Sequence, residues 1–243
     1  MKIIFEKQRL AGLFLAALML FGFNSAIAQT DNSLGTWEIF VLKGNLNKKV
    51  FFTGEFNIRN NNFHSTYDYC EYKGGIGYSL TKSFGILVGA GGYNSSLTGS
   101  FLNTVPSQKE FRIWLDLLLR NSYKRLNFDH RMRFEQRYTS VGNKQRLRYR
   151  LTLTVPVNKP TLSDNTFFVS SSDELFFGQS HPSYEKNRFY IGAGYKLNNN
   201  FTFHLGNMHQ SDYKSSYSLS KNYLKLMIIY NLTHKAQNKH LTT

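Results

Sequence analysis

Two histidine–serine pairs in this sequence have the residue types of a catalytic base and its nucleophile. His209 and Ser211 are two positions apart, so they could share a face near an expected external loop. His64 and Ser65 are adjacent within an expected loop, and His130 is expected to face lipid. A hydrolase of this type also needs a third group that orients the histidine, and the sequence identifies none. Such pairs often arise by chance, so we assign no catalytic residues.

Cysteine, metal and phosphate chemistry have little support. Cys70 is the only cysteine, and the seven histidines are scattered without the close spacing of a metal site. Glycine-rich segments at 74–78, 89–93 and 192–195 are not followed by a helical pattern, as a nucleotide-binding loop would be. We expect these glycines to allow strand curvature and to leave space for long side chains in a narrow lumen. The sequence therefore predicts no metal and no cofactor.

The first 28 residues have the features of a cleavable export signal. Three basic residues precede an apolar stretch at 10–23, and residues 25–28 end in the small-x-small pattern that a signal peptidase accepts. The apolar stretch is shorter than the roughly 20 residues that a membrane-spanning helix needs. We expect cleavage after Ala28, which leaves residues 29–243 as a single domain.

The chain is strongly basic, with a formal charge of +15 that falls to +13 when the three Lys/Arg and one Glu of the signal are removed. Basic chains often bind nucleic acid, but their basic residues then come in runs or patches. Here arginines recur at every second position of aromatic-rich segments, as in 131–137 and 146–150. That spacing is typical of the inward face of a strand, so we expect no nucleic-acid partner.

Alternation of side-chain character predicts the strands that would position these arginines. In 126–138 the apolar and neutral side chains fall on one face and the charged ones on the other, and 146–155 repeats this division. Segment 109–120 alternates as well, with acids among its bases. Further strands are expected at 50–59, 67–80, 84–93, 166–177, 187–197, 201–210 and 221–232.

A soluble sandwich or a lipocalin would alternate in the same way. Three features favour a membrane barrel. Several expected strands match the roughly 9–11 residues that cross a bilayer, an export signal precedes them, and aromatic residues fall at strand ends, where interface girdles occur. These are Tyr78, Tyr195 and Tyr230 at one end and Tyr138 and Tyr149 at the other. We predict an all-β, antiparallel up-and-down transmembrane β-barrel of about 10–12 strands in a Gram-negative outer membrane.

Connection lengths suggest which end faces outward. Short connections at 81–83, 122–125, 158–165 and 198–200 are expected on the periplasmic side, and those at 60–66, 95–108, 139–144, 178–185 and 211–220 outside. Segment 35–42 would be an eleventh strand, which conflicts with the even count of bacterial single-chain barrels. Residues 34–49 are thus either an extra strand or a periplasmic arm, or a twelfth strand has been missed. Residues 234–243 form a polar tail.

The chain resembles the DUF2490 family, uncharacterised proteins of Gram-negative bacteria that are expected to be outer-membrane barrels. The resemblance rests on Trp37, on the segments 55–59, 131–137 and 146–150, on the strand ends at Tyr78 and 92–93, and on 173–176 and 187–188. The paired arginine-rich strands are its most specific part. It implies an outer-membrane location and no established activity.

The charged faces would form an internal charge ladder, in which cross-strand Arg–carboxylate pairs fill and rigidify the lumen. We therefore predict an outer-membrane barrel of unassigned activity with a mostly filled lumen. Outer-membrane lipid and the barrel-assembly machinery are the expected partners, and the oligomeric state is open. An anion-preferring pore or solute-transport barrel is the first alternative, and a membrane-embedded lipid-modifying enzyme is the second, although the sequence favours a non-enzymatic barrel. The ladder consists of Glu55, Arg59, Glu110, Arg112, Asp116, Asp129, Arg131, Arg133, Glu135, Arg137, Arg146, Arg148, Arg150, Glu174 and Arg188.

Overall fold

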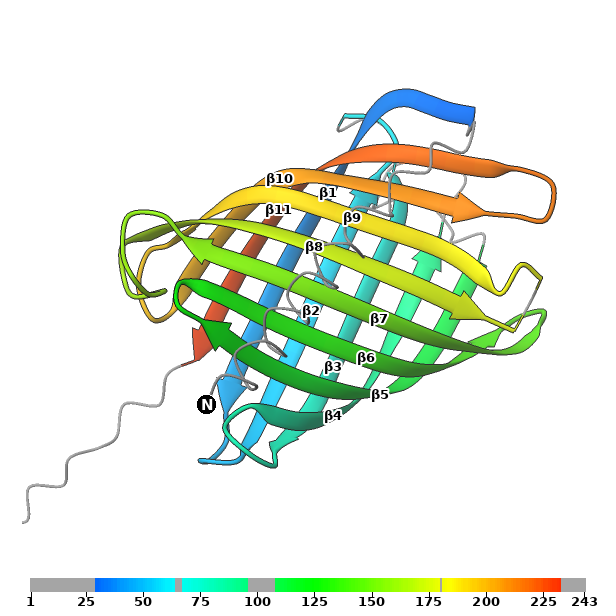
Figure 1. Ribbon diagram of the computed structural model, residues 1–243. Helices are drawn as coiled ribbons and strands as arrows, with labels where there is room; N and C mark the ends of the chain where they lie inside the picture. The colour runs from blue at the N-terminus through cyan, green and yellow to red at the C-terminus, as the bar shows by residue number, and fades with distance from the viewer. Residues whose placement is uncertain (1–28, 64–66, 96–107, 180, 233–243) are drawn as a thin grey trace, which may run out of the picture.

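The computed structural model describes residues 29–63, 67–95, 108–179 and 181–232, which form one closed β-barrel (Figure 1). The expected signal peptide and polar tail lie outside these residues. None of the described residues forms a helix that could span a membrane. The eleven strands are β1 (Gln29–Asn45), β2 (Val50–Asn60), β3 (Tyr67–Ser79), β4 (Phe84–Ser95), β5 (Gln108–Tyr123), β6 (Leu126–Thr139), β7 (Gly142–Pro156), β8 (Thr166–Gly178), β9 (Tyr184–Lys196), β10 (Phe201–Tyr213) and β11 (Ser218–Leu232).

The barrel closes through a parallel pair. Each strand pairs antiparallel with its neighbour in the chain, whereas β1 pairs with β11 in parallel, for example at Trp37 opposite Lys225. An odd number of up-and-down strands requires this, because the first and last strands then point the same way. The segment 35–42 is therefore part of the barrel wall within β1. The predicted barrel of about 10–12 strands is confirmed by the eleven strands, and only the closing pair departs from the predicted antiparallel pairing.

Several strands continue further than the sequence pattern indicates. The β10–β11 hairpin pairs Ser211 with Ser220 and Tyr213 with Ser218, so most of the loop expected at 211–220 is strand. The loop expected at 139–144 is a tight turn, because β6 ends at Thr139 and β7 begins at Gly142, whose φ is +121°. Backbone hydrogen bonds extend these strands into segments that are polar on both faces, where the sequence shows no alternation of apolar and polar residues.

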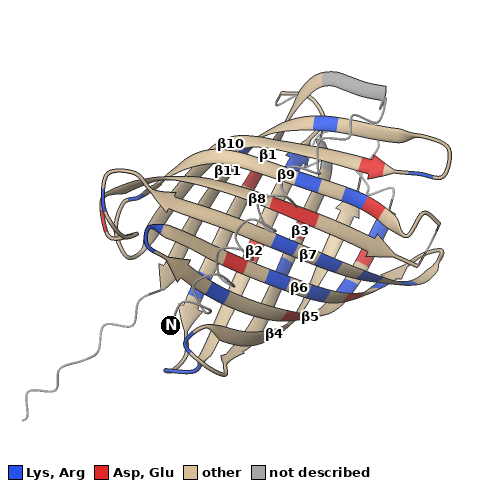
Figure 2. Cartoon of the chain, viewed as in Figure 1, with Lys and Arg blue, Asp and Glu red and all other residues tan. Residues whose placement is uncertain are grey.

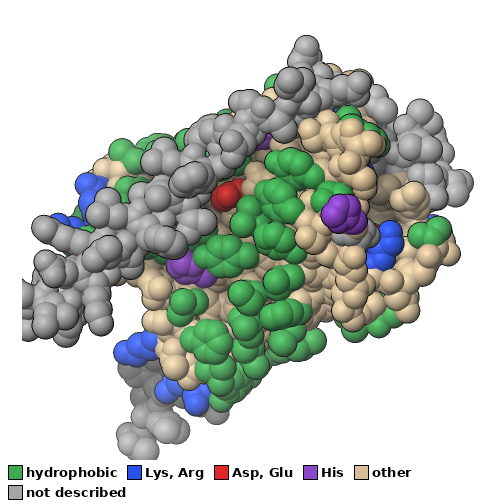
Figure 3. All heavy atoms as spheres, turned by 45° about the vertical axis from the view of Figure 1, so that its right-hand side comes forward, with side chains coloured by type: hydrophobic (Ala, Val, Ile, Leu, Met, Phe, Trp, Pro, Cys, Tyr) green, Lys and Arg blue, Asp and Glu red, His purple; other side chains and the backbone are tan. Residues whose placement is uncertain are grey.

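The two faces of the wall differ in character. Apolar side chains point outward, and the space-filling view shows them gathered over the barrel surface (Figure 3). On β5, for example, Phe111, Ile113 and Leu115 are 40–50 % exposed, while the intervening Arg112 and Trp114 are buried. Basic and acidic positions lie beside one another on neighbouring strands (Figure 2). This is the reverse of a soluble barrel, in which the charged face meets water.

Two glycines make room for large side chains in the lumen. A Cβ atom at Gly89 would collide with the indole of Trp114, and one at Gly194 would collide with the ring of Phe168. Trp114 and Phe168 are buried, with 5 % and 3 % of their surface exposed. These two glycines thus let the rings of Trp114 and Phe168 lie directly against the backbone of the neighbouring strand.

Candidate functional site

The centre of the lumen holds a buried bidentate ion pair between β5 and β6. Arg133 donates from Nε to Oδ1 of Asp116 at 2.7 Å and from Nη2 to Oδ2 at 2.8 Å. The two side chains are only 5 % and 4 % exposed. Bidentate geometry fixes both groups and is among the stronger polar contacts in proteins.

Arg148 of β7 connects two acids on its neighbouring strands. Its Nη1 lies 3.0 Å from Oε2 of Glu135, and its Nη2 lies 2.8 Å from Oε1 of Glu174. Arg131 also donates to Glu174. The arginine-rich strands β6 and β7 thus share two carboxylates from β6 and β8, and this sharing offsets the repulsion between their like charges.

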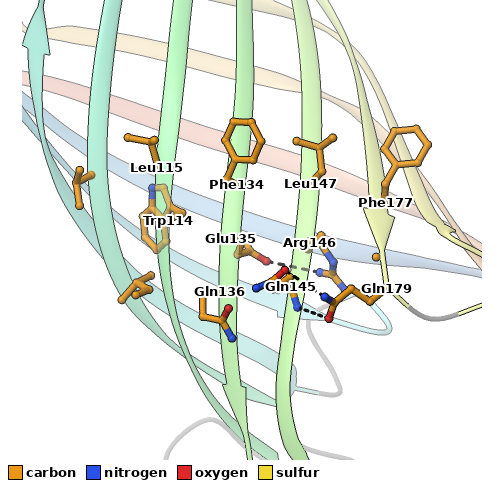
Figure 4. A pocket seen from close by; sticks show the side chains of 13 residues that line it. Trp114, Leu115, Phe134, Glu135, Gln136, Gln145, Arg146, Leu147, Phe177 and Gln179 are labelled. Atoms are coloured by element: carbon orange, nitrogen blue, oxygen red, sulfur yellow. Dashed lines mark hydrogen bonds and ion pairs between the residues drawn. The ribbon is translucent and has the colours of Figure 1, made fainter.

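A second group of ion pairs lies toward the end of the barrel at which β5, β7 and β9 begin. Glu110 accepts hydrogen bonds from both Arg112 and Arg137. Arg146 lies between Glu135, at 3.8 Å, and Glu185 of β9, at 2.6 Å. The close view shows Glu135 and Arg146 turned toward each other, with the apolar row of Leu115, Phe134, Leu147 and Phe177 beside them (Figure 4).

Aromatic rings lie against the arginine guanidinium groups. Arg112 lies 3.7 Å from the ring centroid of Tyr93, Arg133 lies 4.4 Å from that of Trp114, and Arg148 lies 4.5 Å from that of Phe176. Cation–π contacts of this kind occupy the guanidinium faces that the carboxylates leave open. Guanidinium groups and aromatic rings therefore pack against one another in the lumen.

The remaining residues of the expected ladder have varied surroundings. Glu55 lies 2.7 Å from Lys73, and Asp129 lies 3.0 Å from Arg120 in a pair that is largely exposed. Arg59 and Arg188 both lie over the ring of Trp37. No ion pair of Arg150 is found within the described parts of the chain.

Sequence reasoning missed five charged residues that form ion pairs in the interior. Lys73 joins Glu71 to Glu55, Glu185 binds Arg146, and Lys186 binds Asp212 at 2.7 Å. The period-two pattern of Tyr69, Glu71 and Lys73 could have revealed two of them. The others lie near strand ends that the alternation did not mark.

The outer face of β10 and β11 carries a chain of hydrogen bonds among polar side chains. His209 Nε2 lies 3.2 Å from the hydroxyl of Ser211, and His209 Nδ1 lies 3.0 Å from Oδ1 of Asn222. The hydroxyl of Ser220 lies 2.9 Å from that of Ser211. These four residues, the outer-face polar chain, alternate with inward residues such as Met208 and Gln210. Asn222 is exposed, whereas Ser211 and Ser220 are only 9 % and 8 % exposed.

Other polar side chains on this face have different partners. Asn187, opposite Ser211 on β9, donates to Oδ1 of Asp173 at 2.6 Å. His130 bonds the hydroxyl of Tyr149 at 2.8 Å and forms no comparable bond with a serine. His64 and Ser65 lie outside the described residues. Across the described segments, no three His, Cys, Asp or Glu side chains form a group suited to a metal ion.

A family model described as "Protein of unknown function (DUF2490)" matches residues 34–221, most of the chain and nearly all of the barrel. The chain belongs to this family. Searches of curated proteins and of solved structures return no significant match. Membership of DUF2490 carries no activity, so the function of this DUF2490 barrel must be argued from its own residues.

Sequence reasoning also missed Asn222, whose side chain bonds His209 on the side away from Ser211. Asn222 is thirteen residues from His209 and directly opposite it in the β10–β11 hairpin. The hairpin could have revealed it. The strands expected at 201–210 and 221–232 are consecutive, and when both are extended toward each other His209 and Asn222 become direct partners. Without the register, nothing in the local pattern of this DUF2490 chain distinguishes Asn222 from its many other asparagines.

Proposed function

We propose that this protein is an outer-membrane β-barrel, exported by its cleaved N-terminal signal, whose lumen is closed to solute flow and whose working surface is the lipid-facing wall. The observation that carries this proposal is the reversal of the two faces: exposed apolar side chains outside and buried ion pairs inside. A soluble protein would lose stability and solubility by exposing such an apolar band, whereas a bilayer requires it.

Filling of the lumen supports closure. Arg188 of β9 reaches beyond its paired strands, because its guanidinium group lies 4.7 Å from the ring of Trp37 on β1. It also lies 4.9 Å from the ring of Phe176 on the neighbouring β8. An eight-stranded barrel has an interior just wide enough for its own side chains, so a barrel of eleven strands needs long arginine and aromatic side chains to fill its wider interior. An open channel would require these groups to move apart and to leave carboxylates and guanidinium groups unpaired.

An anion-preferring pore is the second candidate, and one observation favours it. Lys43, Arg150 and Lys225 lie on the inward face and form no ion pair among the described residues. Lys43 is near the end of β1, whereas Arg150 and Lys225 are midway along β7 and β11. Lys225 lies 4.2 Å from the ring centroid of Tyr190. Unpaired cations in a lumen attract anions, but these lie within the packed interior rather than along an opening.

Two measurements test this proposal. Membrane fractionation with gel mobility of unboiled and boiled samples should place the chain in the outer membrane as a heat-modifiable species. In planar bilayers the folded protein should show no stable conductance steps. A soluble, unshifted chain would contradict the membrane location, and regular anion-selective steps would favour the pore over the closed barrel.

A further inference from the structure

The donors and acceptors of the outer-face polar chain can be assigned from their chemistry and distances. Oδ1 of Asn222 accepts a hydrogen bond from Nδ1 of His209, which leaves the Nε2 lone pair facing the hydroxyl of Ser211. Ser211 can then donate its proton to Nε2 and accept the hydroxyl proton of Ser220. This is the arrangement of a nucleophile, a general base and a group that orients the base.

The position of the chain on the wall defines what can reach it. Tyr213, two residues after Ser211 on the same face, stacks on Tyr184 with ring centroids 4.8 Å apart. Tyrosine rings concentrate where a membrane meets water. Ser211 lies only about 7 Å from Tyr213 along the strand, at roughly 3.3 Å per residue. At this distance below the membrane surface lie the ester bonds that link the head group of a lipid to its acyl chains.

The surface below the chain is suited to hydrocarbon. Phe189 pairs with His209 across β9 and is 38 % exposed. Ile191, Leu205 and Leu226 continue the apolar surface toward the middle of the barrel, each 44–51 % exposed. An acyl chain lying on this surface would reach the polar chain at the exposed Asn222, and its carbonyl group would approach Ser211 at the 9 % of that residue that is exposed.

We propose that Ser211, His209 and Asn222 form a catalytic triad that hydrolyses acyl esters of bilayer lipids. Ser211 Oγ attacks the acyl carbonyl carbon while His209 takes the hydroxyl proton. The bond from that carbon to the alkoxy oxygen then breaks, and His209 gives the proton to the departing alcohol. Water then attacks the carbonyl carbon of the acyl–Ser211 ester while His209 accepts a proton from the water. The bond from that carbon to Ser211 Oγ breaks, His209 gives the proton to Oγ, and the fatty acid leaves.

Ser220 has a distinct role in this reaction. Its hydroxyl lies 2.9 Å from Ser211 Oγ, so it can donate a hydrogen bond to the negative charge that develops on the carbonyl oxygen. The donor is a side chain because the backbone N–H groups of paired strands are already used in the sheet. The triad and Ser220 come from a single hairpin, so one folding event assembles them.

A purely structural role explains the polar chain less well. Polar groups facing hydrocarbon cost free energy unless they bond each other, and apolar residues would fit the lipid-facing wall without that cost. His130 and Tyr149 show that one bond is enough to satisfy a wall histidine. At His209 both ring nitrogens are engaged, one by a serine hydroxyl and one by an amide oxygen.

The test uses the folded full-length mature chain in detergent micelles with a long-chain alkylsulfonyl fluoride, which labels activated serines. Intact-mass and peptide analysis should place one label on Ser211. Fatty acid release is measured in parallel from phosphatidylethanolamine and from lipid A. Release from only one of them identifies the lipid source. Ser211→Ala should abolish labelling and release, and His209→Ala should lower release by about 10²–10⁴-fold.

Two matched variants control for the membrane setting. Ser171→Ala removes another outward serine, on β8, and His130→Ala removes another outward histidine. Both should keep full labelling at Ser211 and full release. The triad would be refuted if the heat-shifted wild type showed neither labelling nor release from either lipid, or if a control variant lost activity as fully as Ser211→Ala. The inference rests on the membrane location proposed above, and an unshifted, soluble chain would overturn that location instead.

Discussion

The Oδ1 atom of Asn222 lies 3.0 Å from Nδ1 of His209, although thirteen residues separate them in the chain. They are direct partners in the β10–β11 hairpin, and Ser211 and Ser220 are the next outward pair. In an antiparallel pair such side chains lie close enough to bond across the strands. A single hairpin register therefore connects all four polar residues.

Substitutions at Asn222 should show whether this residue acts by orienting the imidazole ring of His209. Asn222→Asp keeps an oxygen that accepts the His209 proton, so lipid-ester hydrolysis should persist. Asn222→Leu removes the acceptor and should lower kcat with little change in KM, because the histidine loses its orientation and tautomer. The measurement is steady-state fatty acid release. Equal activity in the two variants would argue against an orienting role.

The Arg133–Asp116 pair should stabilise the barrel far more than a surface pair does. Asp116→Ala leaves a buried guanidinium group without its carboxylate, so the free energy of unfolding should fall by about 3–5 kcal/mol. The double variant Asp116→Leu with Arg133→Met should recover most of this loss. Urea unfolding in detergent measures both changes.

The Arg120–Asp129 pair provides the control, since its side chains are 75 % and 50 % exposed. Asp129→Ala should cost less than about 1 kcal/mol, as is usual for exposed pairs. Similar losses for Asp116→Ala and Asp129→Ala would mean that water reaches the centre of the lumen, which would weaken the case for a closed barrel.

Gly89 should not tolerate a side chain. Its Cβ position is occupied by the indole of Trp114, so Gly89→Ala should lower the free energy of unfolding by about 1–3 kcal/mol. At Gly54 the nearest atom to an added Cβ is 3.8 Å away, so Gly54→Ala should be neutral or stabilising. Adding Trp114→Phe to Gly89→Ala should restore part of the loss. Equal effects at both glycines would show that Trp114 is not packed against β4.

A disulfide can test the parallel closing pair. Ile39 and Met227 are direct partners between β1 and β11, so Ile39→Cys with Met227→Cys should oxidise readily in a Cys70→Ser background. Ile39→Cys with Leu205→Cys, which faces outward on β10, should not. Non-reducing gels of the folded protein distinguish the two. Failure of the first pair would indicate that β1 leaves the wall.

Alternation in the sequence was enough to predict an all-β barrel and to place most residues on the correct face. Leu126 to Thr139 shows why: side chains two positions apart share a face whatever the rest of the chain does, so a local pattern contains this information. The family resemblance is confirmed by the DUF2490 match. The pattern failed where strands are polar, and Ser211 was therefore expected in a loop.

The local pattern of residues is sufficient to specify the kind of wall: period-two segments with arginines on one face and apolar residues on the other. Which groups meet across the wall depends on the three-dimensional arrangement of the strands. The pairing of Arg148 with Glu135 and Glu174, the parallel contact of β1 with β11, and the position of Asn222 opposite His209 all depend on register between strands. Register is set by pairing between distant segments and by barrel closure, and a one-residue shift would turn every one of these side chains to the other face.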